Sequence, residues 1–188
     1  MSKTTNLSAT TLSDNIHSRQ VTCLEVMQAT LAHIDAINPR YNAVISRVDT
    51  ENLLKQADLK DSQLARGASN GWLHGIPIAI KDIAPTADIA STMGSLLLKN
   101  LIPKADGLMV QRMKAAGCIV IGKTNVPEFG LGSHTFNEVF GATGNAFDPT
   151  KSAGGSSGGA AVALATGMLS VADGSDFMGS LRNPAAWN

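Results

Sequence analysis

The chain has 188 residues, of which 44% are hydrophobic and 16% are charged, enough to bury a core for one or one and a half globular domains. Its 15 basic and 15 acidic residues cancel, which argues against a nucleic-acid partner or an anionic membrane and favours a small or neutral substrate. Cys23 and Cys118 lack metal-ligand spacing and are expected to be buried reduced thiols. With no leader-like start and no apolar run of membrane-spanning length, the sequence predicts a cytoplasmic protein.

Residues 1–70 are predicted to form a helical segment that packs on the rest of the chain. Thr22 and Glu25 have the spacing of a capping box. Apolar residues then recur at helical spacing until Asn38-Pro39, which is expected to end the helix. A short strand at residues 43–48 and a second helix at residues 50–64 should follow.

From residue 71 onward, strand-like runs alternate with helix-like ones, which predicts an α/β core over residues 71–188. Residues 184–187 look like the start of a further element, so we expect this core to be only the N-terminal portion of its fold. The predicted strands are residues 76–80, 118–121 and 168–172, and the predicted helices are residues 107–116 and 159–165.

Residues 117–124, GCIVIGKT, satisfy the phosphate-loop pattern, but their setting argues against nucleotide binding. Asp106 is expected to cap a helix that ends at Gly117, and the apolar run 118–121 then predicts a buried strand. A strand commits its amides to neighbouring strands, whereas a phosphate loop must offer them to phosphates. Lys123, like Lys151, is therefore expected in a solvated loop.

The sequence around Ser156 also matches G-x-S-x-G, the nucleophile elbow of α/β-hydrolases. No strand precedes it, and every histidine lies upstream of Ser156, so the order Ser-Asp-His is impossible in these residues. A serine can instead be activated by a lysine, provided that burial lowers the lysine pKa and leaves the amine unprotonated. The four histidines, each expected to be a surface or hydrogen-bonded polar residue, are His17, His33, His74 and His134.

Lys81 fits that requirement best, because it closes the apolar strand-like run GIPIAIK. Strand alternation places Ile78 and Ile80 on one face and Lys81 on the other, with Asp82 pointing away from the lysine. The isolated pattern fits equally well a lysine that marks the strand end and reaches solvent.

Two segments rich in glycine and serine supply candidate hydroxyls. Residues 154–159, GGSSGG, open a predicted helix with almost no side-chain bulk, which suits close approach and developing negative charge. Residues 174–182, GSDFMGSLR, follow the predicted strand 168–172, and the backbone amides before Ser180 could form an oxyanion hole.

Taken together, these motifs resemble the amidase signature family, whose members work through a Ser–cis-Ser–Lys triad. The resemblance runs from about Thr22 to the end of the chain and includes GIPIAIKD, AAGCIVIGKTNVPEFG, GGSSGG and ADGSDFMGSLRNPAA in the family's order. It implies an α/β fold with a mixed β-sheet core flanked by helices. It also implies a reaction that needs no metal or organic cofactor.

The resemblance implies a role for each site residue. Ser180 matches the nucleophile, Ser156 the bridging serine on a cis peptide, and Lys81 the base. Asp176 and Arg182 either support the loop or are ordinary structural ion partners. The other matched positions are the oxyanion-hole amides of Phe177, Met178 and Gly179, with Ser157, Asp176 and Arg182 as supporting residues.

The implied function is hydrolysis of a small-molecule carboxamide to a carboxylate and an amine or ammonia through a serine acyl-enzyme. Two alternatives stay open: the A-type subunit of a glutamine-dependent amidotransferase, and a catalytically inert truncated fragment. Phe177 and Met178 stand where many members have a small residue and a glycine, which should alter the acyl pocket. A homodimer also stays open, with no nucleic-acid or membrane partner expected.

Overall fold

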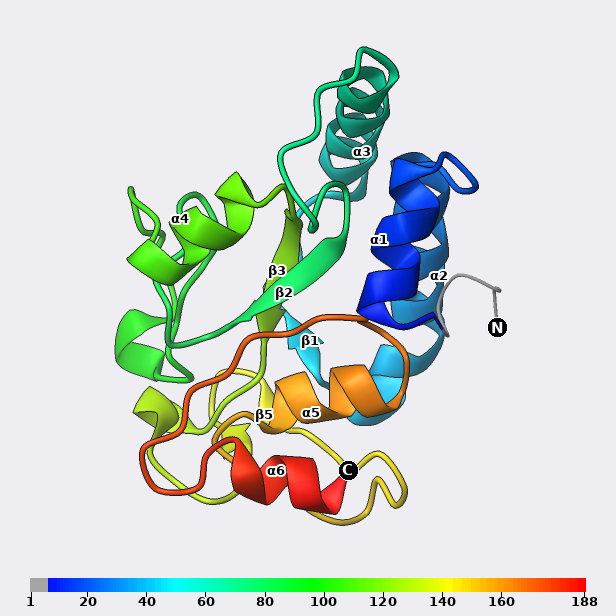
Figure 1. Ribbon diagram of the computed structural model, residues 1–188. Coiled ribbons are helices and arrows are strands. Elements are labelled where there is room, and N and C mark those ends of the chain that lie inside the picture. The colour runs from blue at the N-terminus through cyan, green and yellow to red at the C-terminus, as the bar shows by residue number, and fades with distance from the viewer. Residues whose placement is uncertain (1–6) are drawn as a thin grey trace.

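A three-stranded sheet in the order β1–β3–β2 lies at the centre of the molecule (Figure 1). The computed structural model describes residues 7–188. β2 (Pro77–Lys81) runs parallel to β3 (Ile119–Thr124), whereas β1 (Val44–Ile45) runs antiparallel to it. The sheet is therefore mixed and flanked by helices, and the predicted α/β fold is confirmed.

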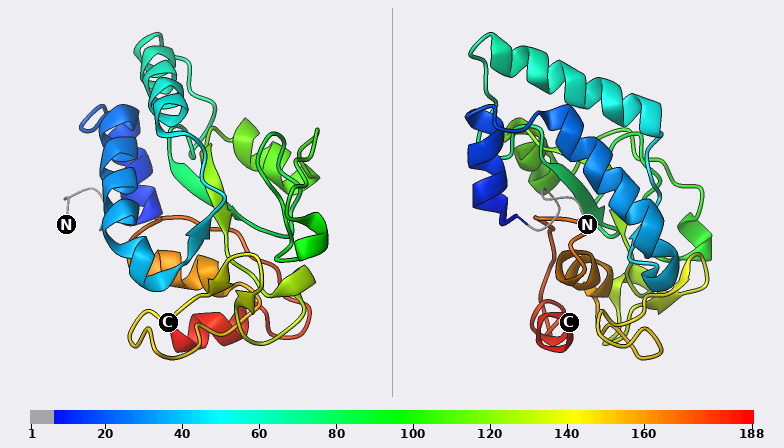
Figure 2. Two further views of the ribbon diagram at one scale, coloured as in Figure 1. Left: turned by 180° about the vertical axis from the view of Figure 1, so that it is seen from behind. Right: turned by 90° about the vertical axis from the view of Figure 1, so that its right-hand side faces the viewer.

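Helices surround this sheet on several sides. In Figure 1, α1 and α2 lie to one side of it, α4 lies to the other, and α5 and α6 lie below. Figure 2 shows α3 running alongside α2. None of the helices in residues 7–188 combines the length and apolar character needed to cross a membrane. The helices are α1 (Ala9–His17), α2 (Cys23–Tyr41), α3 (Thr50–Ala65), α4 (Leu108–Ala115), α5 (Gly158–Ala165) and α6 (Arg182–Trp187), with short 3₁₀ turns η1 (Leu96–Leu98) and η2 (Glu128–Gly130) and a hairpin of β4 (Phe136–Asn137) and β5 (Gly141–Ala142).

The apolar faces of these elements meet in one core. Residues of α2, β2 and β3, such as Ile34, Ile78 and Ile121, are fully buried there. Cys23 and Cys118 are free thiols that are buried in the same core, as expected. Burial of this apolar surface is the main term that stabilises the fold.

α2 begins as predicted and ends later than predicted. The capping box is confirmed, because the Thr22 side chain accepts the Glu25 amide and the Glu25 carboxylate accepts the Thr22 amide. The predicted end at Asn38-Pro39 is wrong, since the helix continues to Tyr41. Pro39 lies in the last turn, where its missing N–H removes a single helical hydrogen bond. Asn42 then ends the helix in the left-handed conformation.

The predicted strand at residues 43–48 is shorter in the structure. Only Val44 and Ile45 pair with β3, because the chain turns at Ser46, where φ is 44°. β3 in turn carries a bulge: Ile78 pairs with Val120 but Ala79 pairs with Gly122, so Ile121 is an extra residue.

The predicted strand at residues 168–172 is wrong. Met168 and Leu169 are buried, so the apolar run correctly indicated burial but not a strand. The segment nevertheless makes no strand pairing. Beyond it, the Asp173 carboxylate accepts the backbone N–H of Lys81 at 2.7 Å. A side chain thus satisfies the edge of β2 where a neighbouring strand would supply a carbonyl.

Residues 117–124, which match the phosphate-loop pattern, form the end of the α4–β3 connection and the strand β3. Asp106 does not cap α4, because Gly107 is the N-cap residue and the Asp106 carboxylate instead accepts the Ala87 amide at 2.8 Å. Gly117 follows the helix with φ 105°, and a Cβ there would lie 2.7 Å from the Cα of His74, so only glycine fits. β3 pairs with strands on both sides, so residues 117–124 do not form a phosphate loop.

Candidate active site

Lys81 points into the protein at the end of β2. It is 1% exposed, and its Nζ donates to Ser156 Oγ at 2.8 Å and to Ser157 Oγ at 2.8 Å. The alternative that this lysine reaches solvent is therefore wrong. Asp82 lies on the opposite side, as strand alternation predicted, where its carboxylate accepts the Thr92 hydroxyl at 2.7 Å.

Burial makes Lys81 chemically unusual. Desolvation lowers the pKa of Lys81 from 10.5 to about 8, although the carboxylates of Asp173 and Asp176 partly oppose this shift. An amine with such a pKa is neutral in roughly a tenth of molecules at pH 7, against a few in ten thousand for an ordinary lysine. Lys81 can therefore accept a proton near neutral pH.

The Ser156 loop is held close to two other segments. The Gly155–Ser156 peptide bond is cis, as the resemblance implies for the bridging serine. A Cβ at Gly155 would lie 2.9 Å from the backbone nitrogen of His134, so the β3–β4 connection touches the loop at that residue. The loop runs directly into α5, whose first residue is Gly158. Side-chain bulk is thus excluded where the loop meets its neighbours.

Ser180 lies beside this loop, and the contact is made by the backbone. The Ser157 N–H donates to the Ser180 carbonyl at 3.0 Å. Ser180 is partly exposed, and its hydroxyl makes no hydrogen bond within residues 7–188. The structure therefore brings Lys81, Ser156 and Ser157 into direct contact, whereas a bond from Ser156 to the Ser180 hydroxyl is not formed.

Asp176 organises the turn that carries Ser180. Its carboxylate accepts Nε of Arg182 at 3.0 Å and Nη2 of Arg182 at 2.8 Å. It also accepts the amides of Gly179, Leu181 and Arg182. These bonds hold the pKa of Asp176 well below its ordinary value. Asp176 and Arg182 thus form an ion pair, and the Asp176 carboxylate also binds the backbone of the turn.

The amides near Ser180 are not all free. The Gly179 N–H already donates to Asp176 at 2.8 Å, so an oxyanion role for it would require that bond to be shared or broken. The amides of Phe177 and Met178 have no acceptor within residues 7–188. The two residues are 93% and 83% exposed, so both lie on the outside of the turn.

Two residues near Lys81 were not predicted from the sequence. Ser175 Oγ is the third hydroxyl partner of the amine, at 3.0 Å, and Asp173 binds the Lys81 backbone. Both lie in the segment 168–176, which no local pattern placed against the end of β2. Their only sequence signal is that they lie at the start of the GSDFMGS motif or immediately before it.

Lys123 is buried, and its predicted place in a solvated loop is wrong. It is 0% exposed because β3 continues through it to Thr124. Its Nζ donates to the carbonyl of Ala84 at 2.6 Å and lies 3.9 Å from Oδ1 of Asp82. Lys151 is exposed, as predicted, and pairs loosely with Asp148.

The four histidines have hydrogen-bond partners away from Ser156. His33 contacts the carbonyl of Thr166, and His134 contacts the hydroxyl of Ser152. His17 and His74 contact backbone carbonyls near the start of the chain and in α3. Their expected place as surface or hydrogen-bonded polar residues agrees with these contacts.

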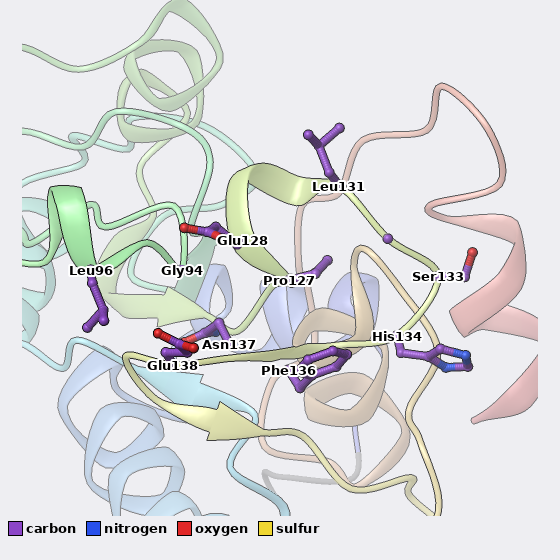
Figure 3. A pocket seen from close by; sticks show the side chains of 11 residues that line it. Gly94, Leu96, Pro127, Glu128, Leu131, Ser133, His134, Phe136, Asn137 and Glu138 are labelled. Atoms are coloured by element: carbon purple, nitrogen blue, oxygen red, sulfur yellow. The ribbon is translucent and has the colours of Figure 1, made fainter.

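A cavity of about 390 Å³ lies along the β3–β4 connection. Figure 3 shows the side chains around it, with Glu128 of the β3–β4 connection and Glu138, just after β4, toward one end and His134 toward the other. The same connection approaches the site, because a Cβ at Gly130 would lie 3.8 Å from Ser156 Oγ. One segment therefore lines the cavity and contacts the serine loop.

The sequence is similar to those of known proteins over nearly the whole chain. Residues 25–188 match the sequence model of the family described as Amidase. The chain is 41% identical over 186 residues to the A subunit of the glutamyl-tRNA(Gln) amidotransferase of Streptomyces coelicolor, covering 99% of this chain and 37% of that relative. It is 43% identical over 169 residues to the corresponding A subunit from Alkaliphilus metalliredigens, covering 90% of this chain and 34% of that one.

Solved structures are similar as well. A bacterial aryl acylamidase of the amidase signature family superposes with a TM-score of 0.93 at 32% identity, covering 99% of this chain and 39% of that one. The peptide amidase of Stenotrophomonas maltophilia gives a TM-score of 0.89 at 34% identity, covering 96% of this chain and 38% of that one. The chain thus spans little more than a third of the length of these relatives.

Proposed function

Because the chain belongs to the amidase signature family, we propose that it carries the catalytic residues of an amidase acting through a serine acyl-enzyme. The substrate class is a carboxamide, and the products are a carboxylate and an amine or ammonia. Lys81 is the base, Ser156 the relay and Ser180 the nucleophile in this proposal.

The proton path follows from the contacts of Lys81. The neutral amine takes the proton of Ser156 Oγ, which takes the proton of Ser180 as that oxygen attacks the amide carbonyl. Ser156 then returns a proton to the nitrogen of the leaving amine, and the C–N bond breaks. Water attacks the acyl-enzyme by the same relay, which releases the carboxylate and restores Ser180.

The observation that carries the proposal is the 2.8 Å contact between Nζ of the buried Lys81 and Oγ of Ser156. Four polar atoms surround that amine, and three of them are hydroxyls that can donate to a neutral nitrogen. The remaining step requires Ser180 Oγ to reach Ser156 Oγ. Catalytic hydrogen bonds of this kind often form only in the substrate complex.

The amides of Phe177 and Met178, which have no acceptor among the described residues, are the proposed donors to the oxyanion. Removing one such donor typically costs about 10²–10³ in kcat, so the turn around Asp176 matters to the rate. Gly179 contributes chiefly by its bond to Asp176, which keeps the turn closed.

Labelling with a fluorophosphonate probe tests the nucleophile. The purified protein should be labelled at Ser180, and Ser180→Ala should abolish labelling while Ser18→Ala, a remote serine on the surface beyond α1, keeps it. Labelling that persists in Ser180→Ala would remove this serine from the proposed role.

A second candidate function is that of an A-type amidotransferase subunit, which is what the relatives at 41–43% identity are named. Glutamine would then be the amide, and the ammonia would pass to an acceptor bound by partner subunits. The expected absence of a nucleic-acid partner would fail in that case. Ammonia release from glutamine, compared with release from an aryl and an aliphatic amide, separates the two candidates. A homodimer and a cytoplasmic location stay predictions.

A further inference from the structure

The catalytic proposal leaves one pair of buried charges unused. Asp82 and Lys123 are both 0% exposed, and their charged atoms lie 3.9 Å apart on the face of the sheet opposite Lys81. Isolated buried charges are costly, so a pair of this kind needs hydrogen bonds that compensate its desolvation. Those bonds go almost entirely to one segment, residues 84–92.

Lys123 binds that segment at three places between Ala84 and Ser91. Its Nζ donates to the Ala84 carbonyl at 2.6 Å, to Thr86 Oγ1 at 2.9 Å and to Ser91 Oγ at 3.3 Å. The ammonium has three N–H donors, and these three acceptors use all of them. One side chain therefore ties together residues that lie up to seven positions apart in the loop.

Asp82 binds the end of the same segment, at Thr92. Its carboxylate accepts the amide of Thr92 at 3.1 Å and the hydroxyl of Thr92 at 2.7 Å. The same hydroxyl accepts the amide of Gly94 at 3.0 Å, which leaves Met93 held between two anchored residues. Met93 adopts φ 51°, a left-handed conformation that a non-glycine residue keeps only when its neighbours hold it.

Met93 connects this loop to the serine site. Its carbonyl accepts the Phe129 amide at 2.7 Å, and Phe129 is also left-handed, with φ 53°. The next residue, Gly130, packs between Ile83 and Ser156: a Cβ there would lie 3.2 Å from the Ile83 side chain and 3.8 Å from Ser156 Oγ. Two strained turns are thus bonded to each other beside the relay serine.

From these contacts we infer that Asp82 and Lys123 are positioning residues, which hold the Met93 carbonyl and thereby keep the turn at Phe129 and Gly130 against Ser156. The inference rests on the proposed function for its catalytic consequence alone. The claim that the pair holds the turn at Phe129 and Gly130 concerns the folded chain, and it applies whether or not Ser180 is a nucleophile.

Amide hydrogen exchange and kinetics together test this inference on the purified protein. In Asp82→Asn and in Lys123→Met, exchange should become faster in peptides covering residues 88–95 and 126–131, with α2 unchanged. The value of kcat should fall by about tenfold or more with little change in KM, because the displaced turn misplaces Ser156. The double variant Asp82→Asn/Lys123→Met should recover part of the loss, since no buried charge is left alone.

The control is Lys55→Met, which breaks the exposed pair with Glu51 and should change neither exchange nor kcat. Thr92→Val is the milder variant if either single variant fails to fold, because it removes only the hydroxyl bonds to Asp82 and Gly94.

Unchanged exchange at residues 126–131 in the folded single variants would overturn the inference. So would a lower Tm with kcat preserved, which is the signature of a merely structural pair. If the wild-type protein is not labelled at Ser180, the proposed function fails, yet the exchange result still decides the positioning role.

Discussion

Lys81 and Lys123 lie at the ends of neighbouring strands, one register position apart, and differ in what surrounds their amines. Lys81 pairs in register with Thr124, and Lys123 with Ile80. Burial lowers the pKa of each lysine from 10.5 to about 8. Burial alone therefore does not distinguish a base from a structural cation.

The hydrogen-bond partners do distinguish them. The close partners of Lys81 are the hydroxyls of Ser156, Ser157 and Ser175, each of which can donate to a neutral amine. Lys123 instead donates to a carbonyl at 2.6 Å and faces the carboxylate of Asp82. Its two hydroxyl partners, Thr86 and Ser91, already donate their own protons to the carbonyls of Ala84 and Ile89. A carbonyl and a carboxylate can only accept, so this site favours the charged ammonium.

The largest effect should come from removing the amine of Lys81. Lys81→Met keeps most of the length of the side chain but has no base, so kcat/KM should fall by about 10³-fold or more, within the range of general base catalysis. Amide hydrolysis and circular dichroism measured on the same preparation give the result. Activity retained near neutral pH by a folded Lys81→Met would remove Lys81 as the base.

A smaller loss is expected from opening the turn that carries Ser180. Asp176→Ala removes the partner of Arg182 and of three backbone amides, so the rate of fluorophosphonate labelling should fall by about 10²-fold. Asp148→Ala breaks an exposed pair with Lys151 and serves as the control. Equal labelling rates in the two variants would mean that Asp176 does not shape the turn.

The pH dependence should follow the titration of Lys81. Its lowered pKa of about 8 means that the neutral base increases as pH rises, so kcat/KM should increase about tenfold from pH 7 to pH 9 and then level off. Replacing Lys123, which is held by acceptors, with methionine should lower the rate but leave the shape of this profile unchanged. A profile that is flat between pH 7 and pH 9 would contradict a lysine base.

Particular residues show how far the sequence could predict this arrangement. Alternation along β2 correctly separated Lys81 from Ile78 and Ile80, because a five-residue apolar strand has one simple period. Lys123 was missed because the strand was predicted to end at residue 121, whereas β3 continues to Thr124 and carries a bulge at Ile121. Strict alternation from Val120 would have placed Lys123 on the face of Lys81, whereas the bulge moves it to the opposite face.

Long-range contacts were the second source of error. Ser175 and Asp173 reach the end of β2 from more than ninety positions away, and the segment before them is buried without becoming a strand. Local apolar character predicts burial, but strand pairing depends on a partner that no local pattern identifies. The helix that follows the loop at Ser156 could be predicted, and α5 begins at Gly158, because that signal lies in a few adjacent residues. The roles of Ser156 and Ser180 stay predictions.

The last prediction concerns stability, on which replacing the two lysines should have opposite effects. Lys81 has a folded-state pKa below its unfolded value, so the folded protein binds fewer protons between about pH 8 and pH 10.5. Lys81 should therefore contribute a rise in stability with pH across that window, by up to about 1.4 kcal/mol per pH unit, and the cost of burying its amine is fully present below pH 8. Lys123, whose pKa is also lowered to about 8, contributes with the same sign, so the pH dependence alone does not separate the two lysines. Lys81→Met removes that cost and should raise the free energy of unfolding at pH 7 by about 1 kcal/mol. Lys123→Met leaves Asp82 buried without its cation and should lower it by about 3 kcal/mol. Urea unfolding at pH 7 and pH 9.5 measures both, and a loss of stability of the same size in Lys81→Met would show that Lys81 is held as a structural cation like Lys123.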